Sequence, residues 1–302
     1  MNPTLHPAKR IAAVHDLSGL GKCSLAVALP VISAAGAECS CIPTALLSTH
    51  TGEFTGYVIK DLSDEMLPIA EHWRSEGAKF DGIYSGYLAS PEQGELLERI
   101  IDRLSGPGTL IVADPVMADN GRYYQNFDHR MCLVFRRLCA AADIVTPNIT
   151  EAAFLSGIEY REPPHDRDYV SALLDGVGSM GPDTVAITGV CFSADEIGTV
   201  AADMRSGKAY CVTRPVRPGV FYGTGDLFAS SFAALTVRGA GLREALYVSS
   251  GLVSDAVERS FLRDAPRRFG VDFEGALPKY IRSVERIFAN AGGGTRTQQP
   301  GI

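Results

Sequence analysis

The sequence predicts an α/β protein in which a mostly parallel sheet is covered by helices on both faces and carries a small flap. Short apolar runs typical of strands alternate along the 302 residues with longer segments typical of helices. Hydrophobic residues make up 46% of the chain and charged residues 21%, which is enough apolar material for a large core. Because no repeat or linker divides the chain, we expect one domain over residues 1–290 and a disordered tail over 291–302.

The first half of the chain contains four expected strands and the flap. A loop over residues 16–21 is expected to connect the first strand to a helix, as a tight strand-to-helix turn. Ser90 and Gln93 have the spacing of a capping box, and Pro91 between them suits the first position of a helix. The expected strands are 11–15, 39–47, 82–85 and 110–113, the flap is 52–60, and the helices end at Gly36, run from Ser63 to about Gly77, and start after Ser90.

The second half predicts two more parallel strands, a hairpin and a helical last third. The first of these strands ends before Pro147 and Asn148, and the second ends at Thr188 and Gly189. The expected strands are 144–146 and 184–187, the hairpin pairs 198–203 with 209–214, and the later helices are one that stops near Gly157, 225–238, 242–263 and one near the C-terminus.

The composition excludes several classes of protein. The net charge is −7, so no basic excess is available to neutralise nucleic-acid phosphates or an anionic membrane. The seven cysteines are an odd number spread over a long chain, which is typical of reduced thiols and not of a disulfide framework. Residues 1–10 lack the apolar stretch of a signal peptide, and the uncharged stretch 23–37, interrupted by Pro30 and following Lys22, is too short to span a membrane. We therefore expect a cytoplasmic protein without a nucleic-acid or membrane partner.

Polar residues follow several of the predicted strands. In a parallel sheet the carboxyl ends of the strands meet at one edge, where ligands bind. The residues concerned are the pair His15-Asp16, then Asp114, the group Thr146, Asn148 and Glu151, and the pair Thr188-Gly189. Polar groups gathered on one edge predict a single active site, which is an arrangement typical of enzymes.

The segment Gly223-Thr224-Gly225-Asp226 opens an apolar helix and predicts an anion site. Glycines allow backbone N–H groups to turn inward, and the N-terminus of a helix adds partial positive charge. An acid in a first helical turn is also ordinary capping. Two glycines around a threonine favour phosphate, because a plain helix start needs neither. Asp226 would repel that anion, so its natural role is to accept the proton of a hydroxyl that attacks phosphorus.

With these motifs the chain resembles the ribokinase-like small-molecule kinases and, among them, the pyridoxal kinases. The loop Gly223–Asp226 resembles the family's anion hole and catalytic aspartate, and 143–152 resembles its Thr-Pro-Asn-x-x-Glu-Ala stretch. Asp114-Pro115-Val116 is similar to the family's Asp-Pro-Val segment. Ser48-Thr49-His50-Thr51-Gly52 resembles the Ser-x-His-Thr-Gly stretch of pyridoxal kinases, and Gly86-Tyr87 their Gly-Tyr. The resemblance implies a three-layer α/β/α sandwich and an ATP-dependent kinase acting on the 5′-hydroxymethyl group of pyridoxal, pyridoxamine or pyridoxine.

The same resemblance implies a role for each candidate residue. Asp226 is the catalytic base and Gly223, Thr224 and Gly225 form the anion hole. ATP is bound by Asp114, Thr146, Asn148, Glu151, Thr188 and Gly189, of which Asp114 and Glu151 also hold Mg²⁺, through water. The substrate ring is read by Asp16, Ser18, His50, Thr51 and Tyr87. The resemblance further implies a homodimer, and it leaves a requirement for K⁺ open.

Two departures from the pyridoxal kinases leave other functions open. Asp16 stands where those kinases have a serine, and His15–Gly19 instead resembles the start of hydroxymethylpyrimidine kinases. The segment 118–124 is not the usual sequence of the family's lid, although Asp119 could still face the nucleotide. The alternatives are therefore a hydroxymethylpyrimidine kinase, a non-catalytic protein that binds vitamin B6, and a sugar kinase, for which the chain is short.

Overall fold

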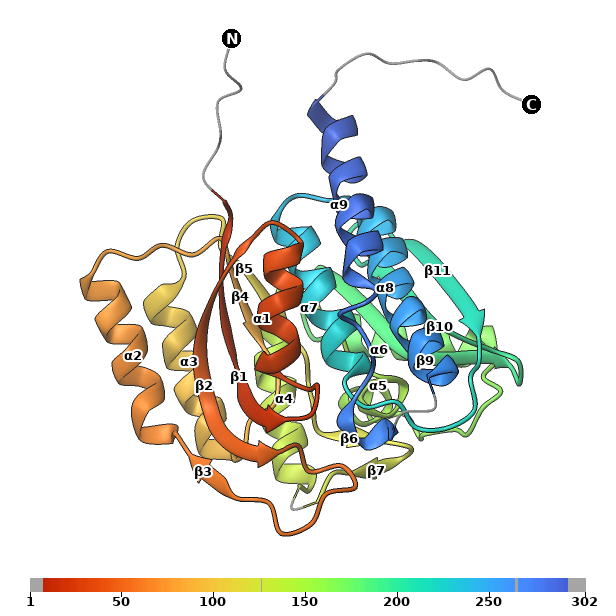
Figure 1. Ribbon diagram of the computed structural model, residues 1–302, viewed down its shortest axis with the longest axis horizontal. Coiled ribbons are helices and arrows are strands. Elements are labelled where there is room, and N and C mark those ends of the chain that lie inside the picture. The colour runs from red at the N-terminus through yellow and green to blue at the C-terminus, as the bar shows by residue number, and fades with distance from the viewer. Residues whose placement is uncertain (1–7, 126, 264–265, 293–302) are drawn as a thin grey trace.

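The computed structural model describes residues 8–125, 127–263 and 266–292. Within these residues nine strands form one sheet in the order β11-β10-β9-β8-β5-β4-β1-β2-β3 (Figure 1). The six strands from β9 to β2 in this order are parallel, whereas β3, β10 and β11 are antiparallel to their neighbours. The strands are β1 Arg10–Leu20, β2 Glu38–Thr49, β3 Ile59–Asp61, β4 Gly82–Ser85, β5 Leu110–Ala113, β8 Ile144–Val145, β9 Thr184–Ser193, β10 Glu196–Asp203 and β11 Lys208–Pro215.

Helices cover both faces of the sheet, as the alternation of strands and helices predicted (Figure 1). One face carries α1 Leu25–Ala34, α7 Thr224–Val237, α8 Leu242–Leu262 and α9 Leu277–Gly292. The other carries α2 Ser63–Ser75, α3 Pro91–Leu104, α4 His129–Ala140, α5 Ile149–Ser156 and α6 Arg167–Gly178. Two short strands, β6 Ala118–Asp119 and β7 Arg122–Tyr123, form a separate hairpin, and η1 is a 3-10 turn over Arg267–Phe269. The architecture is a three-layer α/β/α sandwich.

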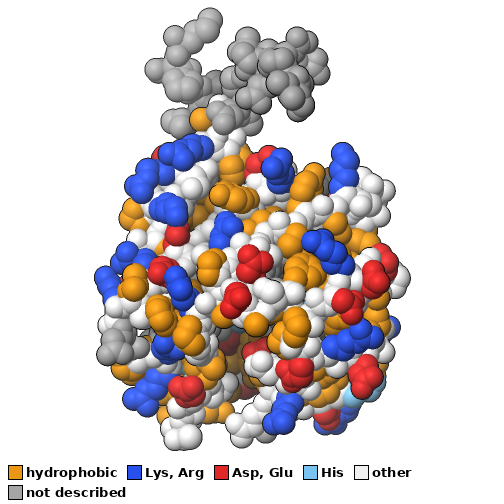
Figure 2. All heavy atoms as spheres, turned by 90° about the vertical axis from the view of Figure 1, so that its right-hand side faces the viewer, with side chains coloured by type: hydrophobic (Ala, Val, Ile, Leu, Met, Phe, Trp, Pro, Cys, Tyr) orange, Lys and Arg blue, Asp and Glu red, His pale blue; other side chains and the backbone are white. Residues whose placement is uncertain are grey.

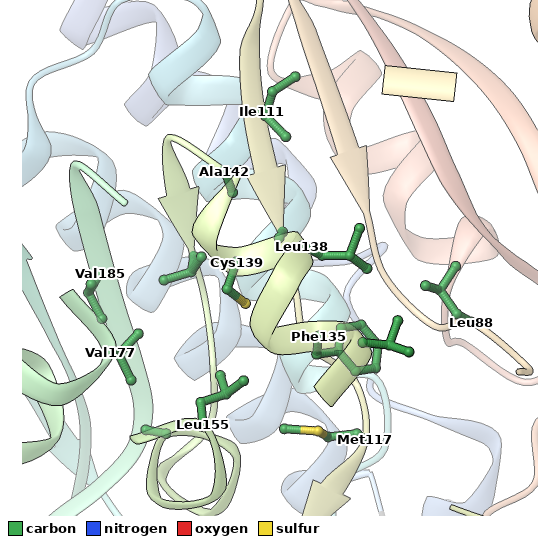
Figure 3. Packing of buried hydrophobic residues seen from close by; sticks show 14 of the residues in the cluster. Leu88, Ile111, Met117, Phe135, Leu138, Cys139, Ala142, Leu155, Val177 and Val185 are labelled. Atoms are coloured by element: carbon green, nitrogen blue, oxygen red, sulfur yellow. The ribbon is translucent and has the colours of Figure 1, made fainter. Parts of the chain in front are cut away.

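The core consists of two apolar clusters, one on each face of the sheet. Successive side chains of a strand point to opposite faces, so Ile11 and Ala13 of β1 enter the cluster under α1 and α7, and Ala12 and Val14 enter the other. Figure 3 shows part of this second cluster, in which side chains of α4 pack with those of β5 and of the segment that follows it. Because both faces of the central strands are buried, the register of the sheet is strongly specified, and the carboxyl ends of the strands are held in fixed relative positions.

The first strand departs from the prediction. The expected loop over 16–21 is strand as far as Leu20, because β1 goes on pairing with β2 after a register shift between His15 and Leu17. The predicted tight turn is therefore wrong, and only Gly21–Ser24 connects the strand to α1. Asp16 lies at the shift and not in a surface loop, which explains why its side chain is buried.

Most other elements match the prediction, but β9 does not end at Thr188 and Gly189, because it continues to Ser193 in its pairing with β10, and α4 and α6 were not predicted. The flap is confirmed by β3, which pairs antiparallel with residues 45–47 of β2, and the hairpin by β10 and β11. Gln93 differs in detail, because its side chain accepts from the N–H of Ala89 and not from that of the N-cap Ser90. The expected tail begins at 291, but α9 continues to Gly292, and the remaining residues 293–302 lie outside the described part of the chain.

The exposed side chains are of mixed type on the face shown in Figure 2, and the cysteine thiols are free. Figure 2 shows basic, acidic and hydrophobic side chains interspersed over the face that it presents. All seven cysteines are free, including Cys39 and Cys41, whose sulfur atoms lie 4.0 Å apart on β2. None of the helices in the described ranges has the length and apolar character that crossing a membrane requires.

Candidate active site

The start of α7 provides backbone donors and an acid at one place. Gly223 is the N-cap and has a left-handed φ of 80°. A Cβ at this position would collide with the carbonyl oxygen of Lys22, so the turn requires glycine. A Cβ at Gly225, in contrast, would meet no atom of the described residues beyond its own helix, so space is free beside the first turn. The N–H groups of this turn have no partner within the helix and are available to an anion.

Asp226, in the same turn, is held on both carboxylate oxygens. Its Oδ1 lies 3.0 Å from Nε2 of His15, and its Oδ2 accepts a hydrogen bond of 2.8 Å from the backbone N–H of Ser24. Burial by itself would raise the pKa of Asp226, but the hydrogen bond and charge of His15, with the N–H of Ser24, bring it below its ordinary value. Asp226 is therefore a carboxylate at neutral pH.

His15 stands between two carboxylates. Its side chain is 1% exposed, and its Nδ1 lies 2.9 Å from Oδ1 of Asp16, whose other oxygen accepts from the hydroxyl of Ser18. Burial lowers the pKa of His15, but Asp16 and Asp226 outweigh this and raise it to about 10. His15 was predicted at this edge of the sheet, beside Asp16, but without a role of its own.

Asp114 follows β5 and lies near Asp226. Burial and the negative charge of Asp226 raise the pKa of Asp114 to about 7, although His15 acts in the opposite direction. The hydroxyl of Thr146, buried beside this carboxyl group, has no hydrogen-bond partner of ordinary geometry among the residues that the structure describes. An unpartnered buried hydroxyl next to a carboxyl group is typical of a place where a ligand supplies the missing partner.

Glu151 and Asn148 fix the hairpin β6–β7 to the start of α5. Glu151 Oε1 accepts from the N–H groups of Met117 and Ala118 at 3.0 and 3.4 Å, and its Oε2 accepts from the N–H of Asn148 at 2.8 Å. Asn148 caps α5 and donates to the carbonyl of Ala118 over 2.7 Å. Burial and the charge of Asp114 raise the pKa of Glu151. Thr188 joins the group, since its N–H donates to the carbonyl of Pro147.

The residues expected to read the substrate ring are in different environments. His50 uses both ring nitrogens within the protein, because Nδ1 accepts from the N–H of Gly52 at 3.1 Å and Nε2 lies 2.5 Å from the carbonyl of Arg268. Its ring also packs 5.0 Å from that of Tyr222, centroid to centroid. Thr51 is exposed, whereas Tyr87 is half-buried and stacked on Phe127.

The predicted residues therefore fall into linked groups. Hydrogen bonds connect Asp16, Ser18 and Asp226 through His15. Asp114 lies close enough to Asp226 for the negative charge of Asp226 to raise the pKa of Asp114. Thr146, Asn148 and Glu151 follow the carboxyl end of β8, beside Thr188 and Gly189, which lie within β9; Gly189 has a φ of 74°. Donors for an anion and a fixed carboxylate at one edge of the sheet are the groups that phosphoryl transfer to a hydroxyl requires.

Comparison with known proteins agrees with this chemistry. Residues 28–265 match the phosphomethylpyrimidine kinase family. The pyridoxal kinase of Rubrobacter xylanophilus is 32% identical over 239 residues, which are 76% of this chain and 80% of the relative, and that of Bos taurus is 30% identical over 67% of this chain and 69% of the relative.

Solved structures of similar proteins agree with these sequence relatives. A Bacteroides thetaiotaomicron protein described as a phosphomethylpyrimidine kinase, in a crystal form with pyridoxal, is 36% identical with a TM-score of 0.86, over 91% of this chain and 96% of that one. Pyridoxal kinase from Lactobacillus plantarum is 30% identical with a TM-score of 0.83, over 93% and 99% of the two chains. This chain therefore belongs to the phosphomethylpyrimidine kinase family and is an enzyme of the ribokinase-like superfamily whose curated relatives include pyridoxal kinases.

Proposed function

We propose that the protein transfers the γ-phosphoryl group of ATP to the 5′-hydroxymethyl group of pyridoxal, pyridoxamine or pyridoxine. The observation that carries this proposal is the ionised, doubly held carboxylate of Asp226 beside the free N–H groups at the start of α7. A protein that only bound the vitamin would need neither group. The names of the curated relatives, and the crystal form of the Bacteroides protein with pyridoxal, support a B6 vitamer as the acceptor.

The transfer follows from these groups. Asp226 orients the acceptor hydroxyl and takes its proton while the hydroxyl oxygen forms a bond to the γ-phosphorus. The bond from that phosphorus to the β,γ-bridging oxygen breaks, and ADP leaves with the electron pair. The N–H groups of residues 223–225 and the dipole of α7 stabilise the charge on the transferring group.

The nucleotide belongs at the carboxyl end of β8, beside Thr188 and Gly189 of the neighbouring β9. Thr146, Asn148, Thr188 and Gly189 line this edge, and the unpartnered hydroxyl of Thr146 is suited to a phosphate oxygen. Asp114 would be the carboxylate that holds Mg²⁺. The described residues contain no group of three or more His, Cys, Asp or Glu that could bind a metal ion, which fits an ion held mainly by water and phosphates. When bound, Mg²⁺ neutralises phosphate charge.

Glu151 would act on this site indirectly. Its oxygens already accept three backbone N–H groups, so it would reach Mg²⁺ only through water, while it fixes the hairpin β6–β7 at the nucleotide. On the acceptor side, Asp16, Ser18, Thr51 and Tyr87 would contact the heterocycle. His50 would shape this part of the site, because both of its ring nitrogens are occupied.

A second candidate acceptor is hydroxymethylpyrimidine. It is favoured by the family match and by Asp16, where pyridoxal kinases have a serine.

A single competition mixture of ATP, the three B6 vitamers and hydroxymethylpyrimidine, followed by mass spectrometry, tests both acceptors. If a B6 vitamer gains phosphate first, the result supports the proposal. If hydroxymethylpyrimidine is phosphorylated faster, it is the acceptor and the proposal is wrong. If pyridoxal binds but ATP is not turned over, the protein is a non-catalytic B6-binding protein. Repeating the assay with KCl or NaCl tests the need for K⁺.

We also infer that the protein forms a homodimer through the flap. Leu46, Val58 and Ile59 are 48%, 70% and 48% exposed at the edge formed by β2 and β3. Exposed apolar side chains on an edge strand favour a partner that covers them. Light scattering after size-exclusion chromatography tests the dimer, and Val58→Lys should convert it to a monomer. A wild-type mass of one chain at micromolar concentration would overturn the inference.

A further inference from the structure

His15 connects two acids that have separate roles in the proposed reaction. Its Nε2 lies 3.0 Å from Oδ1 of Asp226, and its Nδ1 lies 2.9 Å from Oδ1 of Asp16. The imidazole is 1% exposed, and a Cβ at Gly86 would collide with it. Tyr84 packs edge-on against it at a centroid distance of 6.3 Å. The ring is therefore held in one orientation, with each nitrogen directed at a carboxylate.

We propose that His15 is a positioning residue for phosphoryl transfer, which joins the carboxylate that faces the substrate ring to the carboxylate that receives the hydroxyl proton. This inference rests on the proposed function and adds a residue to its machinery. Asp226 can point its free lone pairs at the acceptor hydroxyl only if the carboxylate does not rotate. His15 fixes one oxygen and the N–H of Ser24 fixes the other.

The contact with Asp226 does not depend on whether Nδ1 of His15 carries a hydrogen. The backbone N–H groups of Asp16 and Tyr87 point at Nδ1 from 2.9 and 3.2 Å, which favours Nδ1 as an acceptor, whereas two flanking carboxylates favour an imidazolium. Nε2 carries a hydrogen in both states and donates it to Asp226. A substrate group that binds Asp16 changes the surroundings of Nδ1, and the change reaches Asp226 through one ring. Ring recognition and the proton acceptor are thereby coupled.

The charged and titratable groups around Asp226 determine the sign of the expected pH effect. His15 is hydrogen-bonded to Asp226 and is the main group that lowers its pKa, and His50 acts in the same direction. Asp114, Asp16, Tyr84 and Cys23 face the same region, and each adds negative charge when ionised. Without His15 the carboxylate would lose its closest cationic partner and remain among acids. Its proton affinity would then rise, so activity that needs the carboxylate would be lost at a higher pH than in the wild type.

The test compares His15→Gln, His15→Leu and the wild type, with Tyr84→Phe as the matched control. Gln can still donate to Asp226 but carries no charge, whereas Leu can do neither. Tyr84→Phe alters a buried neighbour of His15 whose hydroxyl has no hydrogen-bond partner within the described part of the chain. The measured quantity is kcat for pyridoxal at saturating MgATP from about pH 5 to 9, because kcat reports the ionisation of groups in the bound complex.

We expect His15→Leu to lower kcat about 10²-fold even at alkaline pH, as expected when a catalytic group is misplaced by about 1 Å, and to lose the remaining activity at a higher pH than the wild type. We expect His15→Gln to recover most of kcat at alkaline pH but to lose activity at a higher pH than the wild type. KM for MgATP should change little. Tyr84→Phe should keep the wild-type profile.

The results separate this inference from the proposed function. A wild type that phosphorylates no heterocycle contradicts the proposed function. An active wild type whose His15→Gln variant keeps both kcat and the acid limb of the profile overturns the role of His15. If His15→Leu does not fold, His15→Gln decides alone. A loss of kcat in both variants without any displacement of the acid limb would also overturn it, because a purely structural defect has that signature.

Discussion

The backbone N–H of Ser24 donates to Oδ2 of Asp226 over 2.8 Å, from a residue whose φ is +59°. Ser24 is the N-cap of α1, yet its side chain makes no capping hydrogen bond. A left-handed conformation is unfavourable for serine, and such strain is found where the surrounding structure needs the backbone to point in one direction. Here the strained backbone directs the N–H of Ser24, at the start of α1, toward the carboxylate of Asp226.

Ser24→Gly should therefore stabilise the protein without reducing activity. Glycine adopts this φ readily, and the donor is a backbone group that the substitution keeps. We expect the free energy of unfolding in urea to rise by about 1 kcal/mol and kcat to stay at the wild-type level. Ser24→Ala, which keeps the strain and removes only the hydroxyl, should leave both unchanged. A less stable Ser24→Gly protein would mean that the hydroxyl, not the backbone, matters here.

Asp226→Asn should abolish most of the activity while the fold survives. The amide keeps the size of the side chain and one acceptor oxygen, but it cannot take the hydroxyl proton. Removal of one group that acts only in the transition state lowers kcat about 10²–10³-fold. The control is Asp175→Asn, an exposed acid on α6, which should behave as the wild type. Turnover by a folded Asp226→Asn protein within a few-fold of the control would contradict the proposed role.

Asp114 predicts a dependence of stability on pH in the ligand-free protein. Its pKa is raised from 3.8 to about 7 by burial and by Asp226, so the folded state holds a proton that the unfolded chain releases. Between about pH 4 and 7 this group therefore makes folding less favourable as pH rises, and the effect is complete above pH 7. Asp114→Asn removes it.

The difference between the thermal midpoint of Asp114→Asn and that of the wild type should therefore increase by several degrees, in favour of the variant, from pH 4 to pH 7.5. The same variant should bind MgATP more weakly, since an amide is a poorer ligand for Mg²⁺ than a carboxylate. Parallel melting curves with pH would show that Asp114 is already ionised throughout this range.

Glu151→Gln tests the attachment of the hairpin β6–β7. The carboxylate accepts from three backbone N–H groups, whereas the amide has one oxygen and would direct its own N–H groups at some of these donors. We expect a loss of about 1–3 kcal/mol in the free energy of unfolding and a raised KM for MgATP. Glu159→Gln, on the exposed segment after α5, is the control and should change neither. Wild-type hydrogen exchange at Met117 and Ala118 in the variant would contradict this role of Glu151.

The parts of the site that depend on neighbouring residues were predictable from sequence. The turn at Gly223 and the capping pair Asn148 and Glu151 are local, and each carries its own residue signature. The alternation of strands and helices likewise fixed the layers and the edge at which polar residues meet. These features need no knowledge of how distant segments pack.

The parts that depend on distant packing were not predictable. His15 and Asp226 are 211 residues apart, and Ser24 and Asp226 are 202 apart, so their contacts follow from the order of strands and the placement of α1 beside α7. The length of β1 was also missed. Gly19 and Gly21 suggested a turn, but the pairing of β1 with β2 keeps the chain extended to Leu20. Tertiary pairing outweighed local preference at that point.

Two glycines of the segment between β2 and β3 allow a matched test of the acceptor side. A Cβ at Gly52 would collide with the ring of Tyr222, which lies directly before the anion-hole turn and packs on His50. Gly56 is the opposite case, because a Cβ there meets nothing, although its φ of 68° is left-handed. One position is limited by contact with the site, and the other only by its backbone.

Gly52→Ala should therefore push the segment around His50 and Thr51 away from Tyr222. Such overpacking costs about 1–3 kcal/mol, so we expect KM for pyridoxal to rise about tenfold or more, with KM for MgATP nearly unchanged. Gly56→Ala should lower the free energy of unfolding by about 1 kcal/mol and leave KM for pyridoxal as it is. Steady-state kinetics with each substrate varied in turn, together with urea unfolding, separate the two effects. Equal KM values for pyridoxal in both variants would mean that this segment does not contact the acceptor, and Thr51 would then lose its proposed role.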